Sequence, residues 1–391
     1  MNWYFISFVL FFIGAALLIL WKRKKITHKY YIFYRYDTKK GIDIIDKIAK
    51  ISPRFWKIFG SIGVFVGFGA MFFGLNMIIE SFMNYLKSPS SFTPSISLVI
   101  PVPFEKLTFA PGFLGVPFWY WIIPVAVLIF FHEGMHGILA RAEKIKIKNL
   151  GLFLLAIIPG AYVEPDEKQL KKANWKSKLR IYAGGSYSNI IIGLIFILFL
   201  TSFYLPKYYD GAVGFSYYTT ENGTQLPARL NNMTGAIYSI DGIRIDNIRE
   251  LAVVMGTKTP GEKINVKTVK GDLVAPFIDT LIIKNPQYHD YEIELADVNG
   301  EPKMGISGFS KVRISNSQGL INFITGIFVW IAILNIGVGI VNMLPIKPLD
   351  GGLMIEALGE RFFPKRKEKI VSIISFLVLF ILIGNILIGF L

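Results

Sequence analysis

The chain has 391 residues, of which 53% are hydrophobic, and carries a formal net charge of +15 at pH 7. So much apolar sequence argues against two or three soluble domains and predicts a protein that crosses the membrane several times. The absence of cysteine excludes disulfides, thiolate zinc sites and a cysteine nucleophile. Most basic residues flank apolar stretches, so a membrane explains the positive charge better than a nucleic-acid partner.

The first apolar stretch, residues 3–21, is followed by four basic residues in a row, at positions 22–25. A secretory signal has its basic residues before the apolar core, so this stretch is predicted to stay as a membrane helix with its N-terminus outside. Residues 22–57 are then predicted to be cytoplasmic. A second helix follows over residues 58–83, in which Gly63 and Gly67 are spaced for close helix contact. Residues 86–116 are predicted to form an external loop.

A third apolar stretch, residues 117–143, is long enough to cross the bilayer and holds His132, Glu133 and His136 near its end. Positions i and i+4 share a helix face, so both imidazoles can bind one metal ion. Glu133 lies beside that ion and can take a proton from a metal-bound water. The H-E-x-x-H pattern also arises by chance on solvated helices. At membrane depth, however, a charged residue costs about 2.5–3.5 kcal/mol, which favours a functional role.

Residues 151–163 are apolar but too short to span the bilayer, and basic residues flank them on both sides. Two interpretations stay open. The segment is either a hairpin or re-entrant piece that dips in from the cytoplasmic face and lines the site, or a short amphipathic piece on the surface. After a basic cytoplasmic segment, residues 168–180, a fourth helix over residues 179–204 is predicted to run outward with Asn189 in its first third.

Residues 205–317 have a different character, because charges of both signs mix and short β-branched stretches alternate with turn signals. The dipeptides at 241–242 and 271–272 are predicted as hairpin turns, and residues 248–255 as a short helix. We therefore expect a small, mainly β domain on the external side. Two N-x-[ST] sequons in this segment suit an external position; they lie at Asn222 and Asn232.

A fifth helix is predicted over residues 320–341 and a sixth over residues 370–391, with the basic residues between them in the cytoplasm. All clusters of Lys and Arg then fall on one side of a single six-helix topology, with both termini and the β domain outside. In this topology the histidine pair, Asn189 and Asp350 meet at one depth, nearer the cytoplasm than the midplane.

A catalytic zinc usually takes three protein ligands and keeps a fourth position for water. His132, His136 and Asp350 would complete that set. The alternative third ligand is Glu164 or Asp166, and Asp350 could instead serve as a helix N-cap at the membrane boundary.

H-E-G-M-H in one membrane helix and N-M-L-P-I-K-P-L-D-G-G in a later one resemble the site-2 protease family of intramembrane zinc metalloproteases. The resemblance covers about residues 118–358 and implies that Asp350 is a zinc ligand. The family also has a G-P-x-x-N type motif, which residues 185–189 match except that Ser186 replaces the usual proline. The resemblance implies that Asn189 helps to hold the scissile carbonyl.

The β domain is similar to a PDZ domain, with G-A-V-G-F near Gly211 as the strand that would precede its ligand groove. The expected fold is a polytopic α-helical membrane protein of about six transmembrane helices with an inserted, mainly β, PDZ-like domain. The expected domains are the N-terminal helices with their loops (1–116), the first part of the protease core (117–204), the PDZ-like domain (205–317), the second part of the core (318–358) and the C-terminal helix (359–391).

The expected function is that of an intramembrane zinc metalloendopeptidase of the cell membrane, which cleaves in or near the transmembrane helices of membrane proteins during regulated intramembrane proteolysis. One zinc ion would be held by His132, His136 and Asp350, with Glu133 as general base and Asn189 as a donor to the oxyanion. Expected partners are transmembrane substrates and the lipid bilayer, with no nucleic acid; a peptide C-terminus is a candidate ligand of the PDZ-like domain. The alternatives are a membrane metal-binding or transport protein and an inactive PDZ-bearing scaffold.

Overall fold

The structure is a computed structural model that describes residues 3–22, 26–29, 33–87, 97–104, 107–110, 112–155, 158–219, 223–277, 280–315 and 319–388. It divides into two compact units. The first consists of Met1–Ile195 and Trp330–Leu391, and the second of Phe196–Val329.

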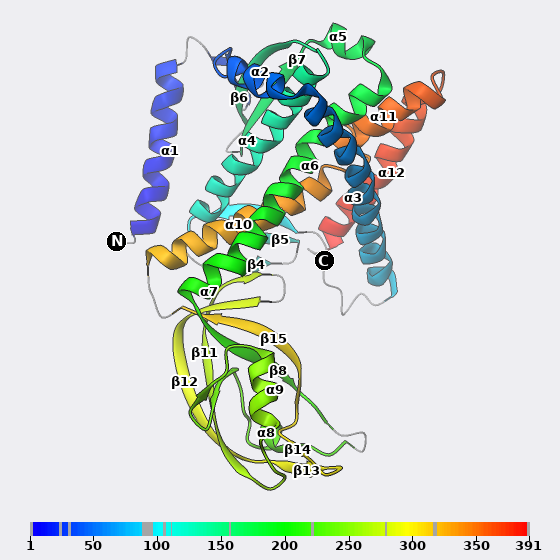
Figure 1. The fold of residues 1–391 in the computed structure, drawn as a ribbon. Helices are drawn as coiled ribbons and strands as arrows, with labels where there is room; N and C mark the ends of the chain where they lie inside the picture. The colour runs from blue at the N-terminus through cyan, green and yellow to red at the C-terminus, as the bar shows by residue number, and fades with distance from the viewer. Residues whose placement is uncertain are drawn as a thin grey trace. The chain divides into compact units, whose positions relative to one another are not determined.

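Six helices among the described residues are long and apolar enough to cross a membrane, in agreement with the predicted number and order (Figure 1). They are α1 (Trp3–Lys22), α3 (Pro53–Lys87), α4 (Phe118–Ala142), the continuous run of α6 (Trp175–Phe199), η3 (Leu200–Tyr204) and α7 (Leu205–Tyr208), α10 (Leu320–Val341) and α12 (Lys367–Ile388). Large apolar side chains point outward from these helices, as Phe65 (83% exposed) and Phe72 (75% exposed) do on α3. Such a surface suits lipid rather than water.

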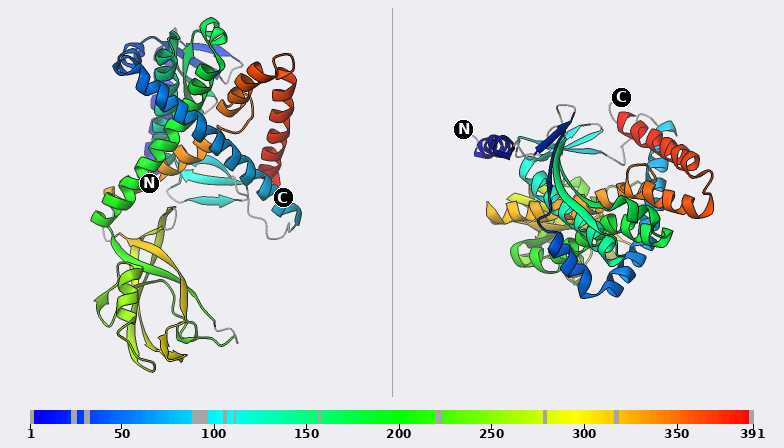
Figure 2. Two further views of the ribbon diagram at one scale, coloured as in Figure 1. Left: turned by 45° about the vertical axis from the view of Figure 1, so that its right-hand side comes forward. Right: turned by 90° about the horizontal axis from the view of Figure 1, so that it is seen from above.

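Helix α3 presents glycines to its neighbours. A Cβ atom on Gly63 would come within 2.8 Å of the Tyr187 ring, and one on Gly67 within 3.2 Å of Met343. The predicted close helix contact at these two positions is therefore present, against α6 in one case and against the chain after α10 in the other. Helix α12 lies against α3 and α11 (Asp350–Phe362), as Figure 2 shows.

The basic segment between the first two membrane helices is folded rather than a plain loop. It contributes two strands to a four-stranded antiparallel sheet of order β1-β2-β6-β7, and the helix α2 (Ile42–Ile51). The strands are β1 (Ile26–Lys29), β2 (Phe33–Thr38), β6 (Ile147–Leu155) and β7 (Ile158–Pro165). Residues 23–25, which belong to the predicted basic cluster, lie outside the described part of the chain.

The apolar stretch at 151–163 forms most of the β6–β7 hairpin, with residues 156–157 outside the description. The segment is thus a β-hairpin, and it contacts α4 through the Val163 N–H and Glu133; its depth in the bilayer stays a prediction. Its backbone groups pair in the sheet, so an apolar segment of this length needs no membrane-spanning helix.

The predicted external loop at 86–116 also contains a sheet, of order β3-β5-β4. Its strands are β3 (Leu98–Val102), β4 (Thr108–Ala110) and β5 (Phe113–Pro117), and residues 88–96, 105–106 and 111 are not described. β5 leads straight into α4, where Phe118 packs against three phenylalanine rings of α1 at centroid distances of 5.0–5.5 Å.

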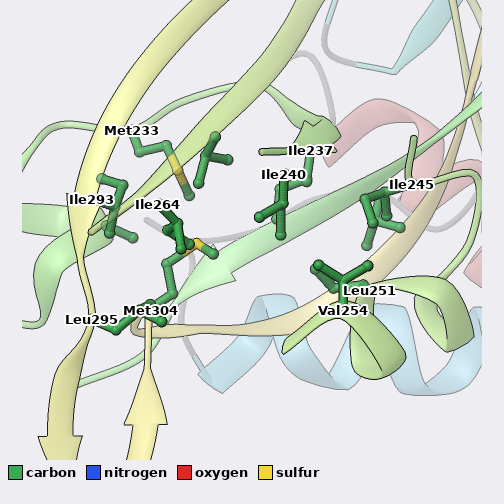
Figure 3. Packing of buried hydrophobic residues seen from close by; sticks show 13 residues of the cluster. Met233, Ile237, Ile240, Ile245, Leu251, Val254, Ile264, Ile293, Leu295 and Met304 are labelled. Atoms are coloured by element: carbon green, nitrogen blue, oxygen red, sulfur yellow. The ribbon is translucent and has the colours of Figure 1, made fainter. Parts of the chain in front are cut away.

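The second unit is mainly β, as predicted. Six strands form a sheet of order β10-β9-β11-β12-β15-β8. A further pairing joins β8, at one end of this order, to β9, the second strand from the other end. The elements of this unit are β8 (Asp210–Tyr217), α8 (Pro227–Leu230), β9 (Ala236–Ile240), β10 (Ile243–Arg244), α9 (Ile248–Met255), β11 (Lys263–Phe277), β12 (Thr280–Glu294), β13 (Ala296–Val298), β14 (Glu301–Lys303) and β15 (Ile306–Ile314). Figure 3 shows its apolar core, where Ile237 and Ile264 are buried between the strands and α9.

Local predictions in this unit had mixed outcomes. Asp241 and Gly242 form the β9–β10 turn with φ values of 48° and 80°, as a two-residue hairpin turn requires. Helix α9 has the predicted bounds. The turn predicted at 271–272 is wrong, because Gly271 lies inside β11 at a register shift where a Cβ atom would collide with the backbone oxygen of Lys284. The glycine there permits a bulge rather than a turn. Asn222 lies outside the described residues.

Candidate metal centre

Helix α4 places two imidazoles one turn apart on the same face. Nε2 of His132 lies 3.2 Å from Nε2 of His136. The carboxylate of Asp350, the first residue of α11, faces both rings. Its Oδ2 lies 3.4 Å from His132 Nε2, and its Oδ1 lies 3.4 Å from His136 Nε2. The three residues predicted as metal ligands are thus brought together, although Asp350 is far from the histidines in sequence.

The chain between α10 and α11 aims Asp350 at the histidines. Helix α10 ends at Val341, and Pro345 and Pro348 prevent a helix from continuing through the connection. The N–H of Gly351 donates to the carbonyl of Asn342 at 3.0 Å. A Cβ atom on Gly351 would overlap the backbone of Met343, so only glycine allows this close return of the chain.

The donor set and its spacing fit a tetrahedral zinc ion. With metal–ligand bonds of 2.0–2.1 Å, the ligand atoms of such an ion lie about 3.3 Å apart. Here the two Nε2 atoms lie 3.2 Å apart, and each lies 3.4 Å from one oxygen of the Asp350 carboxylate, His132 from Oδ2 and His136 from Oδ1. Two imidazoles and one carboxylate are also ligands that zinc commonly takes. The cradle is narrow, because a Cβ atom on Gly185 of α6 would overlap Nε2 of His136 and lie 2.8 Å from Nε2 of His132.

Each imidazole has a contact at its Nδ1 atom that orients the ring, while Nε2 faces the candidate metal position. Nδ1 of His136 lies 2.7 Å from the carbonyl oxygen of Ile181, so this nitrogen donates and Nε2 keeps its lone pair for a metal. Nδ1 of His132 lies 3.1 Å from Nδ2 of the side-chain amide of Asn189, which is fully buried. A metal on Nε2 of His132 requires a proton on Nδ1, and the amide oxygen accepts that proton when the Asn189 amide is turned by half a rotation.

The other polar atom of the Asn189 amide, Oδ1, has no hydrogen-bond partner among the described residues. In the turned orientation that a metal-bound His132 requires, the NH2 group takes this unpartnered position. A buried donor in this position can serve a charge that develops during a reaction. The oxyanion role predicted for Asn189 stays a prediction, and contact with the imidazole of His132 gives the residue an additional orienting role.

Glu133 is held by the β6–β7 hairpin. Its Oε2 accepts a hydrogen bond of 3.0 Å from the backbone N–H of Val163 in β7. This contact fixes the carboxylate that follows the first metal-facing histidine. Among the described strands, β7 is an edge strand of its sheet, and α4 lies against it.

The alternative third ligands are engaged elsewhere. Glu164 accepts a hydrogen bond of 2.8 Å from Arg35. Asp166 caps α5 (Glu167–Lys172) by accepting from the backbone N–H of Gln169 at 2.9 Å, and this bond lowers the pKa of the Asp166 carboxyl. The N-cap position of α11 is taken by Leu349, so Asp350 does not act as that cap.

Two residues of the site were missing from the prediction. The hydroxyl of Ser186 donates to Asp350 Oδ2 at 2.9 Å, and Nδ2 of Asn342 donates to the same oxygen at 3.0 Å. Sequence signals existed for both, because Ser186 departs from the G-P-x-x-N type pattern and Asn342 opens the segment that ends in the Asp350 motif. Neither signal specified a partner.

Comparison with known proteins points to a family of peptidases. The model of peptidase family M50 matches residues 120–382. An uncharacterized protein of Methanocaldococcus jannaschii is 28% identical over 350 residues, which are 87% of this chain and 81% of that protein. The membrane-bound transcription factor site-2 protease homolog of Arabidopsis thaliana is 27% identical over 159 residues, which are 39% of this chain and 30% of that protein.

The family match takes in the part of α4 that holds both histidines, the whole of α6 and the segment that presents Asp350. It covers more than half of the chain. The protein therefore belongs to peptidase family M50, the site-2 protease family of membrane metalloproteases.

Proposed function

We propose that this protein is a zinc-dependent endopeptidase that cleaves peptide bonds in or near the transmembrane helices of membrane proteins. The observation that supports it most directly is the closeness of three side chains: the Nε2 atoms of His132 and His136 lie 3.2 Å apart, and each lies 3.4 Å from an oxygen of Asp350. Glu133 is next in sequence to one of these ligands. A metal carrier needs the three ligands but has no use for a fixed carboxylate beside them.

His132, His136 and Asp350 would hold the ion. When bound, zinc supplies a Lewis acid that polarises the scissile carbonyl and lowers the pKa of its water to about 7. Glu133 takes the proton of the attacking water and later gives it to the leaving amine, while the Val163 N–H keeps the carboxylate in place. The NH2 group of Asn189 donates to the developing oxyanion.

A substrate helix hides its peptide bonds in its own hydrogen bonds and must unwind before cleavage. Strand β7 offers partners for the extended segment. Because the Val163 N–H points away from β6 and toward Glu133, strand alternation places the N–H and C=O of Ala161 on the same outer edge. An extended substrate can pair along this edge toward the base. We expect substrates with Gly, Asn or Pro near the cut, since these residues weaken helices.

The proposed orientation puts both termini and the β domain outside, with the metal centre toward the cytoplasm. The clustering of Lys and Arg at one set of helix ends supports it. In this arrangement water reaches the site from the cytoplasmic side. We propose that the protein is a multi-pass protein of the cell membrane.

The β domain is proposed to bind an extended peptide, such as a newly exposed C-terminus of a substrate. It contains a cavity of about 280 Å³ whose lining includes Leu251 and Met255 of α9 and Met304, Ile306 and Phe309 in and just before β15. The segment near Gly211, predicted to precede the ligand groove, forms β8 but is absent from the described lining of this cavity. Residues 302–306, at the end of β14 and the start of β15, line the cavity instead.

The test of function is cleavage of a transmembrane peptide by the purified protein in detergent or vesicles. We expect cleavage by the wild type, loss of cleavage with a chelator, and a loss of at least about 100-fold in Glu133→Gln, the size expected for a general base. The Glu133→Gln protein should keep one zinc ion per chain. Undiminished cleavage by Glu133→Gln would refute the proposed mechanism. A wild type that binds zinc and moves it across vesicles without cleaving any peptide would instead favour a transporter, and one without either activity an inactive scaffold.

A further inference from the structure

Ser186 lies in the middle of α6 and is fully buried, yet its hydroxyl does not bond within its own helix. It donates to Oδ2 of Asp350 at 2.9 Å. Buried serines in helices commonly return their hydroxyl to a nearby backbone carbonyl. Ser188, two residues later on the same helix, does this with the carbonyl of Gly185 at 2.7 Å, and its hydroxyl also lies 3.1 Å from the carbonyl of Phe131 on α4. The direction taken by Ser186 is thus specific to the metal centre.

Oδ2 of Asp350 receives a second donor. Nδ2 of Asn342 lies 3.0 Å from this oxygen, 3.2 Å from Nε2 of His132 and 3.4 Å from the Ser186 hydroxyl. Each carboxylate oxygen lies 3.4 Å from one ring nitrogen, Oδ2 from Nε2 of His132 and Oδ1 from Nε2 of His136. The two donors occupy the lone pairs of Oδ2, whereas those of Oδ1 are left for a metal. The carboxylate is therefore set to offer Oδ1 rather than both oxygens to an ion between the rings.

We infer that Ser186 is a positioning residue that holds Asp350 as a one-oxygen metal ligand through Oδ1. The inference rests on the proposed zinc site and adds a part that the ligand pattern does not contain. A proline at this position, as in the related motif, has neither a hydroxyl nor an N–H. Hydrogen bonds to the groups that ligate a metal typically change its affinity 10- to 100-fold.

The first test is the zinc affinity of the full chain, purified in detergent and measured by competition with a chromophoric chelator. Ser186→Ala should bind zinc about 10- to 100-fold more weakly than the wild type. The matched control, Ser188→Ala, removes the same hydroxyl from the same buried helix and should stay within about threefold of the wild type. Ser186→Thr keeps a donor hydroxyl and should recover affinity relative to Ser186→Ala.

A second readout reports on the geometry of the site. With Co²⁺ in place of zinc, the wild type should show the strong visible absorption of a four-coordinate ion. In Ser186→Ala, Oδ2 keeps only the Asn342 donor, so its second lone pair can also bind the ion, and the absorption should weaken as the coordination number rises. This measurement does not depend on peptide cleavage, and a purely structural effect of the substitution would leave the spectrum of the bound metal unchanged.

The outcomes separate the two proposals. If Asp350→Ala abolishes zinc binding while Ser186→Ala matches the wild type in affinity and cobalt spectrum, the role of Ser186 is refuted and the zinc site stands. Equal losses in Ser186→Ala and Ser188→Ala would also refute it, because the effect would then belong to the helix. If the wild type itself binds no zinc, the proposed function fails together with this inference.

Discussion

Gly185 of α6 packs directly against the imidazoles of His132 and His136. The position leaves no room for a Cβ atom, which would overlap one ring nitrogen and approach the other. Gly134 has the opposite surroundings, although it lies inside H-E-G-M-H, because no atom of the described residues is within 4 Å of a Cβ built there. A glycine inside the H-E-G-M-H motif is therefore not close to the histidine rings, whereas a glycine of another helix is, because α6 packs against them.

Gly185→Ala should consequently impair zinc binding more than Gly134→Ala does. The added methyl group must push the rings or the helices apart, at a cost of about 1–3 kcal/mol for overpacking. We expect zinc affinity to fall at least about tenfold in Gly185→Ala and to change less than about threefold in Gly134→Ala. Chelator competition on both purified variants checks this, and equal affinities would show that the rings can move aside freely.

At this scale the sequence predicts what local geometry determines. The spacing of His132 and His136 specifies a shared helix face, and this required no knowledge of the tertiary fold. The contacts of the Ser186 hydroxyl and the Asn189 amide depend on the packing of α6 against α11 and α4. Their contacts span 164 and 57 positions along the chain, beyond the reach of any local pattern.

Among the elements, the packing of α3 on α6 depends on small residues. A Cβ atom on Gly63 would lie 2.8 Å from the Tyr187 ring, so a side chain there would force the ring to shift, and one on Gly60 would lie 3.0 Å from Cβ of Arg180. In lipid, helices gain little from burying apolar surface against each other, so close packing at glycines is a main source of association. The fit of α3 therefore supports the helix that presents Ser186 and Asn189.

Gly63→Leu should separate α3 from α6, whereas Gly69→Leu, on the same helix with open space around its Cβ position, should not. We expect the first variant to lose about 1–3 kcal/mol of stability from overpacking. A lower midpoint of thermal unfolding in detergent, together with weaker zinc binding, would confirm the effect. Similar midpoints for both variants would contradict it.

The membrane helices could be predicted from composition, but the two sheets of the first unit could not. β2 pairs with β6, over one hundred residues later, and its own segment contains more charge than a typical strand. The order β3-β5-β4 likewise includes a parallel pair that no local turn specifies. Turn chemistry was informative at Asp241-Gly242, and failed at Gly271 because a bulge and a turn both favour glycine.

At the level of the whole molecule, the chain contains two compact units, each with its own buried core. The core of the second unit is formed entirely by residues of that unit. Separate cores are the condition under which two parts of a chain can unfold independently. Damage to one core should therefore leave the chemistry of the other intact.

Ile237→Ala tests this independence. Ile237 is fully buried in the second unit (Figure 3), and its truncation should cost about 2–5 kcal/mol. Ile243→Ala removes the same atoms from a side chain that is 55% exposed and should cost much less. Limited proteolysis in increasing urea should cut the second unit earlier in Ile237→Ala, while zinc affinity stays at the wild-type value. Joint loss of both properties would show that the units unfold as one.

The order of the segments along the chain gives the metal centre a second consequence. His136 comes before the inserted β unit and Asp350 after it, so an ion shared by these side chains would close a loop of roughly two hundred residues. Crosslinks that close long loops restrict the unfolded chain most. Bound zinc would thus crosslink the two parts of the membrane unit that the inserted β unit separates in sequence, and the free energy of unfolding would rise with the zinc concentration.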